Sequence, residues 1–515
     1  MISRSAWRAI KIRLRRTPAF ATRAAERRAI RRATSFLLNN YPELRAHVHV
    51  VPISTMQWSS VVIQHLGARV AFIDVEQANA LGLLLLRSFW AERPIIAEID
   101  FLIRASEVFY DDGDIPLAIS IAERANQRLC EYCAHENSGD IITRPKIFDS
   151  KLIDILGSGV LVAFITGHEI GHLAQFADVT ENLGFMEWVE QRFEELKVVP
   201  LPADPSFAPI ANRLRFISPE IVQKFTDTGV PNGFASYGSK LAATHRTATA
   251  QLIREVQADA VGVISATDAA MQGGIEADLL FMVLLNVLEH TEMLMLLRRL
   301  VPRLPRGSKR ASIAFEGTNL GARLIHFVRL IHGIRSDEIV VPPEVAAYWK
   351  SLSNDQIAAA DEFEASGHFE QVGERASVVA RGAVEVGLYG KLASHIAAGV
   401  RRADFGILAG VFVMAEAHRG NDIAHYTAEA QYGWTPEAGI APLLAGFGAA
   451  IRDITDVVAN EIRPRDAISR ADIHRDGNDA AFVELLRSGR SQIVRMQRDP
   501  NWSSGFDTLL RVKTE

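Results

Sequence analysis

The chain has 515 residues, of which 48% are hydrophobic and 23% are charged, and its formal net charge is −5. This composition excludes a chain that is disordered throughout, and it predicts a globular protein of two or three domains with ample apolar material for a core. Only two cysteines occur, which argues against an extracellular disulfide scaffold and favours the cytoplasm. The longest apolar stretches are too short or too charged to predict a membrane span.

The N-terminal end is strongly basic. Residues 1–32 contain ten arginines and one lysine against a single acidic residue, Glu26. Trp7, Ile10 and Leu14 recur at helical spacing, so residues 1–40 are predicted to form a basic helical arm. Three alternatives stay open: contact with an anionic membrane or with nucleic acid, an organelle transit peptide, or a solvated helix that pairs with the acidic body. A peripheral membrane location therefore stays an alternative to a purely cytoplasmic one.

The next part of the chain predicts a small sheet followed by helices. Residues 46–53 and 68–75 show strand-like alternation of apolar and polar side chains. Helices are predicted at 77–89, 117–134 and 150–176, so the fold class is α+β and predominantly helical. An edge strand beside the last of these helices would suit the binding of a substrate backbone by strand addition.

The two cysteines, Cys130 and Cys133, are spaced as CxxC, and His135 follows. One such pair lacks the second pair of ligands that a structural zinc site needs, and no strand precedes it as in a redox motif. The pair is therefore interpreted as two small apolar residues on the helix that starts near Leu117. No chemical role is predicted for them.

The strongest motif is His168-Glu169-Ile170-Gly171-His172, an HExxH arrangement within an apolar helix. Because i and i+4 share one helix face, both imidazoles can hold Zn²⁺, while Glu169 can act as general base toward zinc-activated water. Gly171 has no side chain, so another backbone can pass close to the helix here. The alternative is a core helix with two hydrogen-bonded histidines.

A catalytic zinc requires a third protein ligand. Asp178 follows His172 at a spacing that is poor for the same helix face. Glu255 and Asp259 are better candidates, because they share a helix face, so that one can ligate the metal and the other can accept the N–H of a ligand histidine. For an isolated pair of this kind, the alternative is a solvated helix face.

The HEIGH motif followed by a helix reading ExxAD resembles the gluzincin metallopeptidases, and it is also similar to phage-exclusion and regulator-cleaving peptidases of bacteria. The resemblance covers about a hundred residues and implies a zincin-like fold. It implies that His168, His172 and Glu255 bind Zn²⁺, that Glu169 is the catalytic base, and that Asp259 supports a ligand histidine.

One element of the related families is missing. Several of them carry a His-Pro signature with a following Arg after the third ligand, whereas here Arg323 follows Thr318-Asn319-Leu320-Gly321-Ala322. The group that would stabilise the oxyanion therefore stays unassigned. Candidates for it are Arg323, His326, His245 and Tyr237. If none of them reaches the metal, slow or absent turnover is expected.

Residues 178–244, between the two motifs, contain six prolines and are predicted to form an irregular insertion. Its charged helix at 187–197 is interpreted either as a lid or as a surface excursion. Gly273-Gly274 precedes an apolar helix at 277–300, which is expected to pack beneath the site. A basic loop at 302–310 and a double proline, Pro342-Pro343, then indicate a boundary.

The predicted organisation is a basic arm (1–40), a zincin-like metallopeptidase domain (41–340) and an added helical C-terminal domain of unknown role (341–515). The predicted function is zinc-dependent hydrolysis of a protein or peptide substrate. Two alternatives stay open: a non-catalytic binding or regulatory protein with a structural or degenerate zinc site, and hydrolysis of a non-peptide amide. The bond that is cut, the trigger and the oligomeric state are not predicted.

Overall fold

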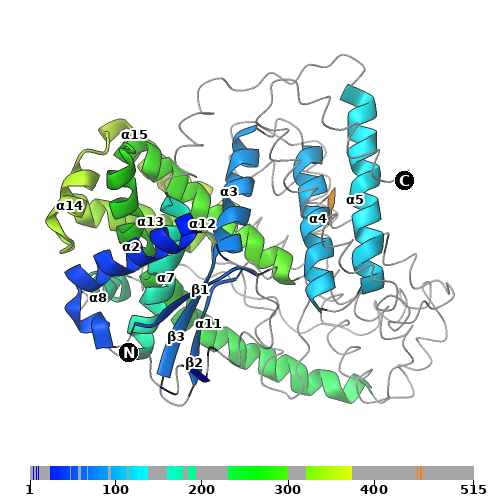
Figure 1. Cartoon of the computed structure of the whole chain (residues 1–515), viewed down its shortest axis with the longest axis horizontal. Coiled ribbons are helices and arrows are strands. Elements are labelled where there is room, and N and C mark those ends of the chain that lie inside the picture. Colours follow the sequence, from blue (N-terminus) through cyan, green and yellow to red (C-terminus); the bar gives the residue numbers. More distant parts are fainter. Residues whose placement is uncertain are drawn as a thin grey trace.

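A computed structural model of the chain is shown in Figure 1. The structure describes residues 24–46, 48–55, 59–65, 68–90, 94–112, 115–136, 159–177, 184–192, 230–299 and 320–373, together with single residues between 4 and 22 and between 449 and 457. This part is mostly helical and contains a three-stranded mixed sheet, which confirms the α+β class. None of its helices has the length and apolar character to cross a membrane.

The sheet consists of β1 (Val50–Ile53), β2 (Val61–His65) and β3 (Ala68–Asp74). The strand β3 is central, parallel to β1 and antiparallel to β2. Its predicted position was confirmed, whereas β1 begins at Val50 and not at Ala46, which belongs to the 3-10 helix η1 (Pro42–Ala46). The strand β2 was not predicted, since its first three residues are all apolar and show no alternation.

The end of β3 is held by a buried carboxylate, Asp74. Its oxygens accept hydrogen bonds from the backbone N–H groups of Thr55, Ser59 and Glu76 and from the Thr55 hydroxyl. In return, the N–H of Asp74 donates to the Ser60 hydroxyl at 2.9 Å. This network joins the turn before β2 to the start of the helix that follows β3.

The α-helices follow in chain order: α2 (Ala24–Asn40), α3 (Val75–Trp90), α4 (Pro94–Asp112), α5 (Ile115–Glu136), α7 (Val160–Ala177), α8 (Gly184–Arg192), α11 (Val230–Gly273), α12 (Ala277–Arg299), α13 (Leu320–Arg335), α14 (Pro343–Lys350) and α15 (Asn354–Ala365). Helices α3, α5 and α12 lie where they were predicted. Helices α4 and α13 were not predicted. The expected basic loop at 302–310 and the segment 150–158 lie outside the described residues.

Helix α11 begins at Val230, so the prediction of an irregular segment extending to residue 244 was wrong for its last part. Pro231 lies in the first turn, where a missing N–H costs no intrahelical hydrogen bond, and it therefore does not break the helix. Helix α8 (Gly184–Arg192) covers the first part of the charged helix expected at 187–197, and residues 193–197 lie outside the described residues. Its Phe185, Met186 and Val189 are buried.

Helices α7 and α11 form the most extensive helix contact of the described fold, and glycines make it possible. A Cβ atom on Gly167 would lie 2.6 Å from the carbonyl oxygen of Val261, and one on Gly171 would lie 2.7 Å from the Cα atom of Ala258. The predicted close approach of a second backbone at Gly171 is thus confirmed. This approach brings the HEIGH motif of α7 alongside Glu255 in the middle of α11.

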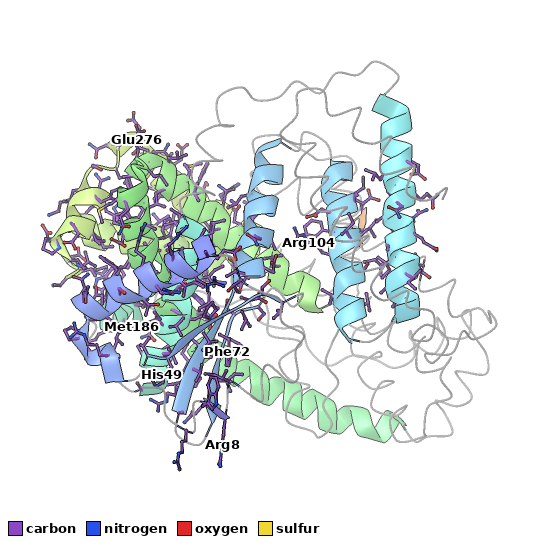
Figure 2. The ribbon with its side chains drawn as sticks, viewed as in Figure 1. Arg8, His49, Phe72, Arg104, Met186 and Glu276 are labelled. Carbon is purple, nitrogen blue, oxygen red and sulfur yellow. The ribbon has the colours of Figure 1, made fainter. Side chains whose placement is uncertain are left out.

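Part of the basic arm belongs to the core. Helix α2 packs against α7 and buries Ile30, Ala33 and Leu37, while Arg28 and Arg31 on its other side are exposed. Ile10 is also buried, in a small cluster with side chains of the sheet. One of these is Phe72, which Figure 2 labels. Residues 11–21 of the arm lie outside the described residues.

The double proline starts a helix within the core and does not separate two cores in the described part of the chain. Pro343 lies in the first turn of α14. Trp349 at the end of α14 is fully buried and donates its indole N–H to the Thr267 hydroxyl of α11 at 3.0 Å. Most of the predicted C-terminal domain, 341–515, lies outside the described residues.

Candidate metal centre

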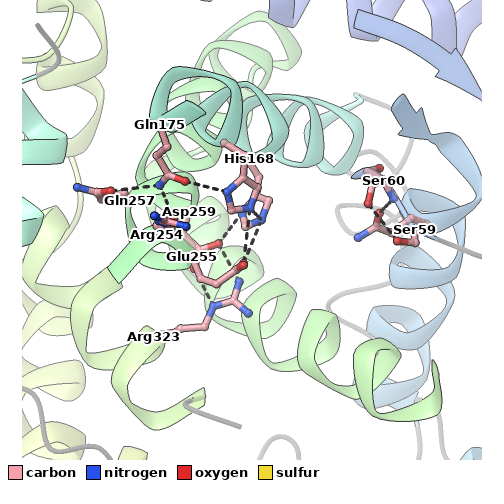
Figure 3. A network of polar contacts seen from close by, with 11 residues as sticks. Ser59, Ser60, His168, Gln175, Arg254, Glu255, Gln257, Asp259 and Arg323 are labelled. Atoms are coloured by element: carbon pink, nitrogen blue, oxygen red, sulfur yellow. Dashed lines mark hydrogen bonds and ion pairs between the residues drawn. The ribbon is translucent and has the colours of Figure 1, made fainter. Parts of the chain in front are cut away.

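Three ligand-type side chains converge where α7 and α11 meet (Figure 3). The Nε2 atoms of His168 and His172 are 3.1 Å apart, and Oε2 of Glu255 lies 3.4 Å from the first and 3.7 Å from the second. A donor atom from each of the three lies within 4.8 Å of the others. The structure therefore brings together the three residues that the two motifs predicted.

The spacing of these atoms fits zinc. Tetrahedral zinc with bonds of about 2.0–2.2 Å to nitrogen and oxygen holds its donor atoms about 3.3–3.6 Å apart. The three observed separations of 3.1, 3.4 and 3.7 Å fall close to this range. Two imidazoles and a carboxylate are also a common ligand set of catalytic zinc, in which water takes the remaining position. The residues present therefore fit a zinc ion.

The ligand side chains keep contact with the outside although their helices are buried. The exposed fractions of the His168, His172 and Glu255 side chains are 15%, 18% and 33%. The side chains of Thr166, Ile170 and Leu173 on the same helix are fully buried. Helix α7 therefore packs in the core on most sides and exposes one polar face to solvent. Solvent access of this kind is what a site with exchangeable ligands requires.

His168 is anchored by a carboxylate. Its Nδ1 atom lies 2.9 Å from Oδ1 of Asp259. Because an ionised carboxylate only accepts hydrogen bonds, Nδ1 carries the proton and Nε2 faces the other ligands. Asp259 in turn accepts two hydrogen bonds from Arg323 on α13, each 2.8 Å long. The predicted role of Asp259 as support for a ligand histidine is consistent with this contact.

Glu169 is buried next to the ligands. Burial lowers the pKa of His172, but contacts with Glu255 outweigh it and raise this pKa, and the negative charge of Glu169 adds to the same effect. Helical geometry turns residue 169 by about 100° from residue 168, so the two side chains leave α7 in different directions.

The electrostatics of the cluster favour a cation. Burial lowers the pKa of His168, but contacts with Asp259 and Glu255 outweigh it and raise this pKa to about 10. Burial raises the pKa of Glu255, but the two imidazoles hold it well below the usual value. Likewise, Arg323 and His168 keep the pKa of Asp259 below its usual value despite burial. The two carboxylates thus attract positive charge, which a metal ion can supply in place of protons.

The structure places the oxyanion candidates in different surroundings. Arg323 uses two of its N–H groups on Asp259. His326 is buried, with its ring 6.3 Å from that of Trp188, and burial lowers its pKa to about 4. His245 and Tyr237 lie on a part of α11 whose side chains are outside the described residues. Asp178 lies outside the described residues altogether. The oxyanion-stabilising group therefore stays unassigned.

Two glutamines that the sequence analysis did not consider also belong to the site. The Nδ1 atom of His172 lies 3.0 Å from Oε1 of Gln175, and the Gln175 amide nitrogen donates to Gln257 on α11 at 3.1 Å. The spacing of Gln175, three residues after His172, was the available signal in the sequence.

Cys130 lies on α5, as interpreted from the sequence, and it is exposed. Cys133 belongs to the same helix, but its side chain lies outside the described residues.

Comparisons with known protein families, with curated proteins and with solved structures gave no match. The two motifs and the geometry of the cluster that they form are therefore the basis for a functional assignment.

Proposed function

We propose that this protein is a zinc-dependent peptidase with a zincin-like core and that it hydrolyses peptide bonds of a protein or peptide substrate. The observation that carries the proposal is the convergence of two imidazole Nε2 atoms and one carboxylate oxygen from α7 and α11, beside the buried Glu169. The low number of cysteines supports a cytoplasmic location as part of the same proposal.

Each residue of the cluster has a role in this proposal. His168, His172 and Glu255 hold the zinc ion, which when bound polarises a carbonyl group and lowers the pKa of water. Glu169 accepts the proton of the attacking water and passes it to the amine nitrogen that leaves. Asp259 keeps His168 oriented, and Arg323 keeps Asp259 ionised. The nucleophile is therefore water and no covalent intermediate with the protein forms.

The sheet supplies a site for the substrate backbone. Helix α7 packs against β3 and β2, and β2 is an outer strand of the sheet. Among the described residues β2 pairs with β3 alone, which leaves its other edge for an extended peptide to join by strand addition. Such binding uses main-chain hydrogen bonds and favours substrates in an extended conformation.

Two observations favour catalysis over a purely structural zinc site. A structural zinc is usually enclosed by four protein ligands, whereas the described residues supply three. The ligand side chains are also partly exposed. A closed structural site would be expected to bury them.

The test is the variant Glu169→Gln, which removes the base and leaves the three ligands in place. Wild-type and variant proteins are loaded with zinc and incubated with a random-sequence peptide library, and the products are identified by mass spectrometry. We expect the wild type to cleave and the variant to lose at least 100-fold in rate while it retains zinc. Glu362→Gln, on the surface of α15, is the matched control. Equal cleavage by wild type and Glu169→Gln, or no cleavage by the zinc-loaded wild type, would refute the proposal.

A further inference from the structure

We propose that Gln175 and Gln257 are positioning residues that hold the second ligand histidine, His172, in the tautomer that binds metal through Nε2. The inference rests on the metal site of the proposed function, but it does not require that the site be catalytic. Four hydrogen bonds carry it: they lead from two backbone carbonyls through the two glutamine amides to the imidazole.

The orientation of the Gln175 amide is fixed by its contact with a backbone carbonyl. Its nitrogen donates to the carbonyl oxygen of Arg254 at 2.7 Å. A carbonyl oxygen has no proton to give, so the nitrogen of Gln175 must face it. The oxygen of the same amide then faces His172, at 3.0 Å from Nδ1.

The tautomer of His172 follows from this orientation. An amide oxygen only accepts, so Nδ1 of His172 must carry a proton. In the neutral imidazole Nε2 is then left with its lone pair, and Nε2 is the atom that faces His168 and Glu255. Metal ions bind an unprotonated nitrogen, and with Nδ1 committed to Gln175 the nitrogen left for the metal is Nε2.

A second backbone carbonyl fixes Gln257. Its nitrogen donates to the carbonyl oxygen of Met186 on α8 at 3.0 Å, so its own oxygen faces Gln175 and accepts a hydrogen bond of 3.1 Å. Gln257 is buried, with 4% of its surface exposed, which shields these bonds from water. Both amide orientations are therefore dictated by main-chain groups of α11 and α8.

The two ligand histidines are thus held by different chemistry. His168 is held by the ionised Asp259, whereas His172 is held by a neutral amide. A carboxylate at position 175 would face two oxygen atoms, those of Arg254 and Gln257, and would repel both. A glutamine at this position satisfies one donor and two acceptors together, which no carboxylate or hydrocarbon side chain can do.

The test measures zinc affinity of the full-length protein by competition with a chelator. Gln175→Met keeps the length of the side chain and removes its hydrogen bonds, and we expect zinc affinity to fall about 10- to 100-fold. Gln257→Met should lower it by a smaller factor, and the double variant should lose less than the product of both losses, because both act through one chain of contacts. Gln272→Met removes a glutamine contact to Asp268 on the same helix and is the matched control, with affinity within about twofold of wild type.

A second readout separates positioning from general stability. In protein labelled with ¹⁵N at histidine and loaded with zinc, we expect the His172 ring to show a protonated, hydrogen-bonded Nδ1 and a metal-bound Nε2. Gln175→Met should weaken the hydrogen-bond signature of Nδ1. A metal-bound Nδ1 in the wild type would overturn the inference. Unchanged zinc affinity in both folded variants would also overturn the inference. If Gln175→Met does not fold, the zinc affinity of Gln257→Met alone decides the test.

The outcome is distinguishable from failure of the proposed function. If zinc affinity depends on both glutamines but the library is not cleaved, the positioning role stands and the peptidase proposal fails. If the library is cleaved and both variants bind zinc as the wild type does, the peptidase proposal stands and the positioning role fails. If the wild type binds no zinc, both are refuted.

Discussion

Arg323 donates two hydrogen bonds of 2.8 Å to Asp259, and through this carboxylate it supports His168 of the metal centre. Both partners are buried, at 6% exposure each. The pair joins α13 to α11 and neutralises a charge that would otherwise be costly inside the fold. His168, a candidate metal ligand, is thus supported by a residue that follows it by 155 positions in the sequence, from 168 to 323.

Removal of Arg323 should therefore strongly reduce the stability of the fold. Arg323→Ala leaves Asp259 buried without its main counter-charge, and we expect a loss of about 3–5 kcal/mol in the free energy of unfolding. Urea denaturation of the metal-free protein measures this. The matched control is Arg192→Ala, because Arg192 pairs with Glu338 at 3.1 Å on the surface, and its loss should cost less than about 1 kcal/mol. Similar losses of unfolding free energy in the two variants would show that the buried pair contributes no more to stability than the surface pair.

The contact between α7 and α11 should not tolerate a single added methyl group. In Gly171→Ala the new Cβ would lie 2.7 Å from the Cα atom of Ala258, so the helices must separate. We expect a loss of about 1–3 kcal/mol in stability and weaker zinc binding, because Glu255 moves with α11. Gly184→Ala, where a Cβ meets nothing within 4 Å, is the control. Thermal unfolding and zinc titration of both variants test this prediction. Wild-type stability and zinc binding in Gly171→Ala would contradict the close contact between α7 and α11.

The third ligand can be tested by metal content alone. Wild-type protein purified with zinc should contain about one zinc per chain, and Glu255→Ala should retain little of it after dialysis, because two imidazoles without the carboxylate bind zinc weakly. Elemental analysis gives the stoichiometry. Glu276→Ala, after the end of α11, is the control. Full zinc retention in Glu255→Ala would remove Glu255 from the ligand set.

Removal of zinc should destabilise the protein. A ligand that binds only the folded state adds RT ln(1 + [L]/Kd), which is about 2.7 kcal/mol when its concentration is 100 times Kd. The melting temperature should therefore fall when a chelator removes the metal and recover when zinc is restored. Glu255→Ala should show no such response, and an equal response in that variant would place the stabilising metal elsewhere.

The carboxylate at the end of β3 predicts a pH dependence that is independent of the metal. Burial raises the pKa of Asp74 to about 6, although its hydrogen bonds with Thr55, Ser59 and Glu76 partly oppose this. Between pH 3.8 and 6 the folded protein therefore holds a proton that the unfolded chain has released, so this group's contribution to stability falls as the pH rises through that window. The difference in unfolding free energy between wild type and Asp74→Asn, measured by urea denaturation from pH 4 to 7, should shift in that direction. A difference that is constant with pH would contradict the raised pKa.

The local geometry of the site could be predicted from the sequence, and its long-range support could not. His168 and His172 share a helix face, as do Glu255 and Asp259, because i and i+4 spacing fixes that relationship wherever the helix lies. The missing side chain of Gly171 likewise indicated a close backbone contact. The partnership of Arg323 with Asp259 gave no such signal, since it depends on how α13 packs on α11.

Other features were missed for similar reasons. Gln175 and Gln257 are ordinary polar residues until two helices bring their amides together. Pro231 and Pro343 were interpreted as interruptions, but each lies in the first turn of a helix, where proline is tolerated. Helix α4 is as amphipathic as the predicted helices α3 and α5, so its pattern could have been recognised in the sequence and was overlooked.

The arginine that neutralises Asp259 also imposes an order on biosynthesis. A ribosome finishes α7 and α11 before it has made α13, so a nascent chain that ends near residue 300 already carries all three metal ligands but not the guanidinium group that steadies one of them. Until that group arrives, the Asp259 carboxylate has to stay hydrated or protonated, which works against burial of the α11 surface around it. A truncated product that ends before residue 323 would therefore carry both motifs without the guanidinium group that pairs with Asp259.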